Sequence, residues 1–180
     1  MKKQKEIIIG VTGGISAYKS CELVRMLQKK GYAVSVLMTK EAAHFVTALT
    51  FRTLTQRPVI TDMFSEDMEW DPAHISIAEK ADLICIVPAT ANIIAKLACG
   101  ICDDIISCVV TASKAPKIIC PAMNDNMFRH PIVTDNIEKL KGIGYKIVPP
   151  VKGTLATGKT GIGHLADMDT IIRAIDKSLP

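Results

Sequence analysis

Three short stretches of the sequence, "HIS", "PATAN" and "PAMNDNMF", carry the side chains best suited to chemistry on a small molecule. His74 can exchange a proton near neutral pH, while Asn92 and Asn124 offer amide donors and acceptors. Each residue also has a structural alternative, since His74 can start or cap a helix, Asn92 can cap one and Asn124 can close a loop. We expect all three stretches to lie at the ends of strands, where the sheet opens. Together they would form a pocket with a titratable group, amides and thioethers.

A glycine-rich turn, "GVTGGIS" at 10–16, lies between an apolar run and a helical pattern, where free N–H groups and a helix dipole attract anions. Thr12 occupies the second glycine position of the dinucleotide pattern G-x-G-x-x-G, and no acid ends the second strand to bind a ribose. Hydroxyls of Ser16 and Thr39 beside the Gly13 and Gly14 amides suit a terminal phosphate, which favours a mononucleotide. The alternative is a tight turn with a capping serine.

A second glycine-rich stretch, "GTLATGKTGIG", satisfies the nucleotide-loop pattern G-x-x-x-x-G-K-[ST]. That loop must open a helix at its Lys-Thr pair, but Gly161 and Gly163 interrupt any helix there. Few residues follow, so no later strand can supply a magnesium-binding aspartate. The sequence therefore argues against a phosphate loop in this stretch.

Alternating apolar runs and helical patterns must position these residues. They predict an α/β fold in a single domain over 1–180: a Rossmann-like (flavodoxin-like), doubly wound, mostly parallel sheet with helices on both faces. Ligands of such sheets lie outside the carboxyl ends of the strands. In the pattern over 41–55 we expect Ala42, Phe45, Leu49 and Leu54 to point inward. The predicted strands are 7–11, 32–38, 57–63, 82–89, 117–123 and 145–150, and the predicted helices 17–31, 41–55, 72–81, 91–98, 103–112, 131–140 and 166–177.

Composition limits the classes of partner. The chain has 180 residues, 48% of them hydrophobic, and a net charge of +4 from scattered Lys and Arg, which argues against a nucleic-acid groove. Apolar runs are too short to cross a membrane and no signal peptide is recognisable, so we expect a cytoplasmic protein. The six cysteines fall in apolar or helical stretches and are expected to act as small hydrophobes. Cys99 and Cys102 have metal or redox spacing but lack a second pair, so no metal is predicted.

Four motifs in order, "GVTGGISAYK", "HIS", "PATANIIAKLACGICDD" and "PAMNDNMF", resemble those of the homo-oligomeric flavin-containing cysteine decarboxylases, especially the bacterial phosphopantothenoylcysteine decarboxylases. The resemblance covers essentially the whole chain. It implies FMN and no metal, with His74 as the active-site histidine and Asn124 holding the substrate carboxylate. It also implies a phosphate site at Gly13, Gly14, Ser16 and Thr39, flavin contacts from Ala89, Thr90, Ala91 and Asn92, and a site lined by Ala122 and Met123.

The resemblance further implies a reaction and an assembly. FMN takes two electrons from a C-terminal cysteine unit, carbon dioxide leaves, and an enethiol remains, which the reduced flavin converts to a thiol in the pantothenoyl branch. His74 would act as the base. FMN would lie at a subunit contact of a homotrimer or dodecamer, with a fused or separate phosphopantothenoylcysteine synthetase as partner. Oxidative decarboxylation of a peptide's C-terminal cysteine, or flavin binding without turnover, are the alternatives.

The segment at about 152–166 corresponds to the family's mobile flap, L-A-C-G-x-x-G-x-G-R, whose cysteine protonates the enethiol. Thr157 stands at the cysteine position and His164 at the arginine position. A hydroxyl is a far weaker proton donor than a thiol. Three accounts remain open: Thr157 is an altered donor, water or His164 replaces it, or the reaction stops at the enethiol.

Overall fold

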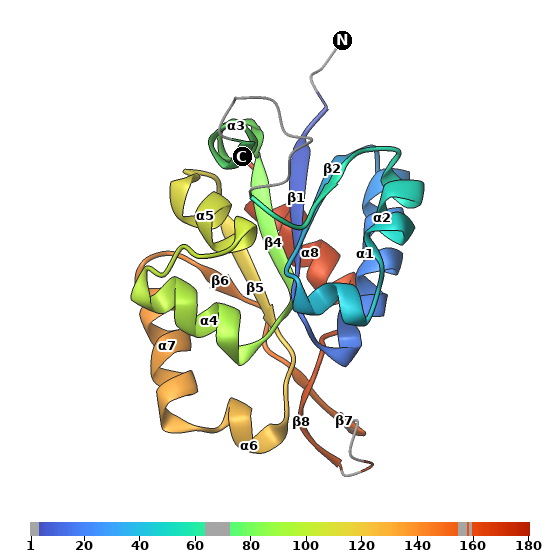
Figure 1. Ribbon diagram of the computed structural model, residues 1–180. Helices are drawn as coiled ribbons and strands as arrows, with labels where there is room; N and C mark the ends of the chain where they lie inside the picture. The colour runs from blue at the N-terminus through green and yellow to red at the C-terminus, as the bar shows by residue number, and fades with distance from the viewer. Residues whose placement is uncertain (1–3, 64–72, 155–157, 159) are drawn as a thin grey trace.

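The computed structural model describes residues 4–63, 73–154, 158 and 160–180. Six parallel strands form its central sheet in the order β3-β2-β1-β4-β5-β6 (Figure 1). The apolar, β-branched runs form the inner strands, because residues buried on both faces of a parallel sheet have no polar side to alternate with. The strands are β1 (Glu6–Val11), β2 (Ala33–Met38), β3 (Val59–Ile60), β4 (Leu83–Ala89), β5 (Lys117–Pro121) and β6 (Lys146–Ile147).

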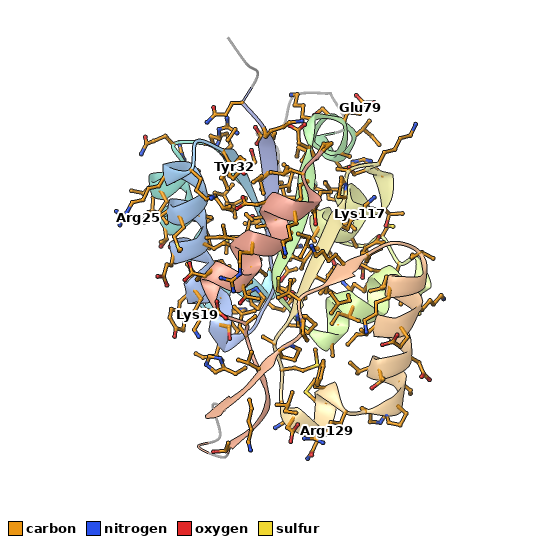
Figure 2. The ribbon with its side chains drawn as sticks, turned by 180° about the vertical axis from the view of Figure 1, so that it is seen from behind. Lys19, Arg25, Tyr32, Glu79, Lys117 and Arg129 are labelled. Carbon is orange, nitrogen blue, oxygen red and sulfur yellow. The ribbon has the colours of Figure 1, made fainter. Side chains whose placement is uncertain are left out.

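Helices cover both faces of the sheet, as predicted for a doubly wound α/β fold. Ile7 and Ile9 of β1 pack on the side of α1 and α8, whereas Ile8 packs on the side of α4, α5 and α7. Figure 2 shows α8 in front of the sheet. The helices are α1 (Lys19–Lys29), α2 (Ala48–Thr55), α3 (Ala73–Lys80), α4 (Ala91–Cys99), α5 (Ile105–Ala112), α6 (Asp125–Phe128), α7 (Pro131–Gly142) and α8 (Met168–Ser178), with 3₁₀ turns η1 (Ile15–Tyr18) and η2 (Glu41–His44).

The expected helix over 41–55 is broken in two. η2 ends at His44 and α2 begins at Ala48, so the helical spacing is not continuous across the break. The prediction that Phe45 and Leu49 point inward is therefore wrong: their side chains are 47% and 70% exposed. Cys99 and Cys102 are also exposed, contrary to the expectation that all six cysteines serve as buried hydrophobes.

A two-stranded antiparallel hairpin, β7 (Val151–Thr154) with β8 (Thr160–His164), extends beyond the lower end of the sheet beside α6 (Figure 1). Neither it nor the short helix α6 was predicted. Because Thr160 begins a strand, no helix opens there, which confirms that "GTLATGKTGIG" is not a phosphate loop.

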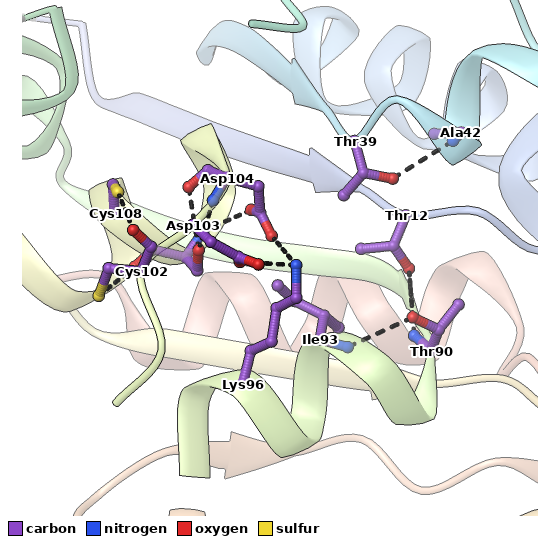
Figure 3. Close-up of polar contacts among 11 residues, drawn as sticks. Thr12, Thr39, Ala42, Thr90, Ile93, Lys96, Cys102, Asp103, Asp104 and Cys108 are labelled. Atoms are coloured by element: carbon purple, nitrogen blue, oxygen red, sulfur yellow. Dashed lines mark hydrogen bonds and ion pairs between the residues drawn. The ribbon is translucent and has the colours of Figure 1, made fainter. Parts of the chain in front are cut away.

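The corner between α4 and α5 is fixed by paired charges (Figure 3). Asp104 caps α5: its carboxylate accepts from the Ser107 N–H at 2.9 Å, and the Ser107 hydroxyl in turn accepts from the Asp104 N–H at 3.2 Å. Lys96 donates to Asp103 and Asp104 at 2.7 and 2.8 Å. These contacts hold the start of α5 close to α4.

No helix among the described residues is long and apolar enough to cross a membrane.

Candidate functional site

A cavity of about 410 Å³ opens where the carboxyl ends of β1, β4 and β5 face the hairpin. Its walls are largely apolar, and no carboxylate is among the described residues that line it. An anion can therefore enter without meeting a like charge on the wall. The cavity is lined by Gly13, Gly14, Ile15, Ser16, Tyr18, Lys19, Thr90, Ala91, Ala122, Met123, Asn124, Met127, Gly163 and His164. The structure thus brings together eight of the predicted site residues: Gly13, Gly14, Ser16, Thr90, Ala91, Ala122, Met123 and Asn124.

Thr12 joins the two strand ends beneath this cavity. The Thr12 residue is 1% exposed, and its hydroxyl donates to the Pro88 carbonyl at 2.8 Å. The same hydroxyl accepts from the Thr90 N–H at 3.1 Å (Figure 3). A glycine at this position, as in the dinucleotide pattern, could make neither bond. Thr12 therefore fixes the start of α4, where Thr90 is the N-cap, relative to the glycine-rich turn.

Replacing Thr12 by Val should lower the free energy of unfolding by about 1–3 kcal/mol, because the buried Pro88 carbonyl and Thr90 N–H lose their shared partner. Urea denaturation measures the change. Thr12→Ser keeps the hydroxyl and is expected to recover most of the loss. Equal destabilisation by both variants would mean that the methyl group, and not the two hydrogen bonds, holds this position.

The glycine-rich turn passes close to η2. A Cβ at Gly13 would lie 2.5 Å from Cβ of Glu41 and 3.0 Å from its backbone carbon, so only glycine fits. The Gly14 N–H donates to the Thr12 carbonyl at 3.0 Å. In this conformation Gly14 offers a ligand close approach but not its amide, which departs from the prediction that both glycine amides face the phosphate.

Three residues predicted to contact the cofactor lie outside the cavity lining. Thr39 lines a neighbouring cavity of about 230 Å³, and its hydroxyl accepts from the Ala42 N–H at 3.3 Å. Ala89 is fully buried, and its carbonyl accepts from the Ala122 N–H at 3.1 Å. Asn92 is exposed on the first turn of α4. Thr39, Ala89 and Asn92 were predicted from their place in the motifs, but residues that are neighbours in the sequence need not face the same cavity.

His74 lies apart from the cavity within one chain. His74 is on α3, which immediately precedes β4 in the chain. Figure 1 shows α3 at the end of the sheet where β4 begins. Figure 2 shows Glu79 of α3 at the top of the molecule and Lys19 of the cavity wall in its lower half. The expectation that "HIS" lies where the sheet opens is wrong for a single chain, because the segment precedes β4 and does not follow it. Thr157, the third predicted catalytic residue, lies outside the described residues.

The hairpin is fixed to the loop that follows β5. The Met123 N–H donates to the Gly163 carbonyl at 3.0 Å, and a Cβ at Gly163, whose φ is +157°, would lie 2.0 Å from the Met123 carbonyl oxygen. The Ile162 N–H donates to the Asp125 carboxylate at 3.3 Å. A hydrogen bond from Arg129 lowers the pKa of Asp125, so this carboxylate remains an acceptor at neutral pH. The hairpin thus forms one wall of the cavity.

Two basic side chains meet at this wall: Lys19, which was not predicted for the site, and His164, which the sequence placed in the flap as one possible replacement for its cysteine. Lys19 Nζ lies 3.4 Å from His164 Nε2, and His164 Nδ1 lies 3.0 Å from the Leu165 carbonyl oxygen. The carbonyl can only accept, so Nδ1 carries a hydrogen and Nε2 of the neutral ring faces Lys19 as an acceptor. Lys19 comes three positions after the glycine-rich turn, within the motif "GVTGGISAYK", which is a sequence signal for its place here. The place of His164 depends on the hairpin.

Comparison with known proteins gives a family and two kinds of relative. The family model described as Flavoprotein matches residues 1–180. A "Probable phosphopantothenoylcysteine decarboxylase" of Streptococcus mutans is 43% identical over 177 residues, which cover 97% of this chain and 99% of that protein. The "Coenzyme A biosynthesis bifunctional protein CoaBC" of Borreliella burgdorferi is 43% identical over 175 residues, 97% of this chain but 45% of that protein. The chain thus spans about half the length of the bifunctional relatives it matches.

Solved structures agree in fold. A cysteine-to-serine variant of PPC decarboxylase, in complex with pantothenoylaminoethenethiol, superposes with a TM-score of 0.89 at 26% identity, covering 97% of this chain and 98% of that one. The FMN-dependent cysteine decarboxylase SpaF superposes with a TM-score of 0.84 at 30% identity, covering 97% and 95%. The α/β fold predicted from the sequence is therefore confirmed.

Proposed function

The chain belongs to the Flavoprotein family, and from that premise we propose that it decarboxylates 4′-phosphopantothenoylcysteine with FMN as cofactor. The relatives named above are a "Probable phosphopantothenoylcysteine decarboxylase" and a "Coenzyme A biosynthesis bifunctional protein CoaBC", both at 43% identity. The single observation that carries the proposal is the cavity itself, which joins the glycine-rich turn to the "PAMNDNMF" loop and has no carboxylate among the described residues of its wall.

The cavity fits an anionic flavin cofactor on its own geometry. Glu41 leaves no room for a side chain at Gly13, so the backbone there stays open to a ligand. Ser16 presents a hydroxyl to the cavity, and Lys19 supplies positive charge. About 410 Å³ lies within the range of small-molecule sites. We assign the phosphate to Gly13, Gly14 and Ser16, and the ring contacts to Thr90 and Ala91.

FMN would accept two electrons from the Cα–Cβ–SH unit of the substrate and later return them. The protein's own residues bind and orient the reacting groups. Asn124 caps α6 through its carbonyl oxygen, which accepts from the Asn126 N–H at 2.9 Å, so its NH₂ group remains to hold the substrate carboxylate. Met123 and Met127 supply apolar walls, and the hairpin covers one side.

A second copy of the chain is part of this proposal. His74, Thr39 and Asn92 do not line the cavity of a single chain. We propose that a homo-oligomer, a trimer or a multiple of trimers, brings them to the cofactor across a subunit contact. Exposed Ile15 and Tyr18 beside the cavity are apolar surface that such a contact would bury.

Carbon dioxide release from 4′-phosphopantothenoylcysteine, with mass spectrometry of the product, tests the function. We expect stoichiometric carbon dioxide and a product that is either 4′-phosphopantetheine or its enethiol, two hydrogens lighter. A peptide ending in cysteine serves as the competing substrate. Turnover of the peptide alone would assign the chain to peptide modification, and bound FMN without turnover of either compound would assign it to flavin binding only.

A further inference from the structure

We propose that His164 is the proton donor of the reductive step, a role that nothing in the glycine-rich flap pattern gives to this position. The inference rests on the proposed function, because it concerns the second half of that reaction. Three observations carry it: the need for one proton in each turnover, the place of His164 on the cavity wall, and the tautomer fixed by its two neighbours.

The stoichiometry requires an acid. In the net reaction a carboxylate is replaced by hydrogen, so one carbon dioxide leaves and one proton is consumed. In the second half, the C=C bond of the enethiol becomes a single bond and two C–H bonds form. Bound FMN, with its phosphate at Gly13, Gly14 and Ser16 as assigned above, would supply two electrons and one hydrogen to the sulfur-bearing carbon. A proton must reach the carbon that has lost the carboxylate.

His164 lies where that carbon is expected. Asn124, assigned to the substrate carboxylate, and His164 line the same cavity. The bond from the Met123 N–H to the Gly163 carbonyl joins the residues directly preceding each of them. The imidazole lies beside Gly153 on β7, where an added Cβ would be 3.4 Å from Cβ and Cγ of His164. His164 and Asn124 therefore lie close together on the hairpin side of one cavity.

The local hydrogen bonds leave Nε2 as the exchanging atom. Nδ1–H is committed to the Leu165 carbonyl, and Nε2 lies 3.4 Å from Lys19 Nζ, which can supply a proton. In the step itself the Nε2–H bond of the protonated ring breaks and a C–H bond forms. Among the described residues of the cavity wall, the other side chains with a hydrogen on oxygen or nitrogen are those of Ser16, Tyr18, Lys19, Thr90 and Asn124, and His164 is the one imidazole. Histidine is the side chain that most often serves as a general acid or base.

The test uses the FMN-bound protein with 4′-phosphopantothenoylcysteine and measures carbon dioxide and the ratio of thiol to enethiol. In His164→Gln we expect carbon dioxide in the first turnover, with the thiol-to-enethiol ratio lowered about 10²-fold. His164→Arg keeps a positive charge but cannot donate a proton, and should show the same loss. Thr157→Cys in the His164→Gln background should recover the thiol. His130→Gln, an exposed histidine outside the cavity, is the matched control.

A readout that needs no turnover tests contact directly. Addition of pantothenoylaminoethenethiol should shift the ring-proton NMR signal of His164, assigned by its absence in His164→Gln, and leave that of His130 in place. Full thiol formation by His164→Arg would show that charge and not proton transfer matters, and would overturn the proposal. Enethiol as the sole wild-type product would also overturn it while leaving decarboxylation intact, whereas no carbon dioxide from the wild type would instead contradict the proposed function.

Discussion

Replacing His74 by Asn is expected to lower carbon dioxide release by about 10²–10⁴-fold, the usual contribution of a general acid or base. Asn keeps a polar side chain of similar size but cannot take up a proton. Because His74 does not line the cavity of its own chain, FMN should remain bound. Initial rates with 4′-phosphopantothenoylcysteine, together with the flavin absorbance of the purified variant, measure both effects. Unchanged turnover would remove His74 from the mechanism.

The same variant tests whether the site is shared between subunits. If His74 acts on a neighbouring chain, mixing His74→Asn subunits with Asn124→Asp subunits should create some sites in which both residues are intact. Activity of the mixed oligomers would then exceed that of either variant alone. If the mixtures stay as inactive as their parents although mass spectrometry shows exchange of subunits, both residues act in a site formed by one chain. That result would contradict the proposed contact.

Replacing Gly163 by Ala is expected to lower kcat/KM by about 10²-fold, the loss typical of a misplacement of about 1 Å in an active site. The added Cβ would lie 2.0 Å from the Met123 carbonyl oxygen, so β8 must move and its bond to the Met123 N–H is lost. The cavity wall that carries His164 moves with it. Steady-state kinetics and FMN retention together separate a displaced wall from a lost cofactor.

Gly142→Ala is the matched control. A Cβ at Gly142, the last residue of α7, meets no atom within 4 Å. We expect this variant to keep full activity and to gain up to about 1 kcal/mol of stability, since alanine restricts the unfolded chain. Gly163→Ala with kinetics equal to those of Gly142→Ala would show that contact between hairpin and loop is dispensable for the reaction.

Much of the fold follows from the sequence alone. Runs such as Ile7 to Ile9 are apolar on both faces, which only a sheet covered on both sides accommodates, and the intervening helical patterns fix the parallel topology. The hairpin could not be predicted in the same way. Its strands "VKGT" and "TGIGH" lack an apolar alternation, and they are held by pairing with each other and by Met123 and Asp125 far back in the chain.

The candidate site could be predicted where it depends on backbone placement. The glycine-rich turn, Thr90 and the "PAMN" loop meet in one cavity because each directly follows a strand of the same sheet. Lys19 and His164 lie 145 positions apart, and no local pattern indicates that they meet. His74 could not be placed for a different reason: its segment precedes a strand, and the role proposed for it requires the proposed contact with a neighbouring subunit.

The central claim, that this chain is an FMN-dependent decarboxylase, is tested most directly by the absorption spectrum of the purified protein. The account predicts a yellow protein whose flavin band bleaches when 4′-phosphopantothenoylcysteine is added without air, with release of carbon dioxide, and then recovers as the thiol forms. A colourless protein that does not bind added FMN, or a flavin band that the substrate leaves unchanged while no carbon dioxide appears, would contradict it.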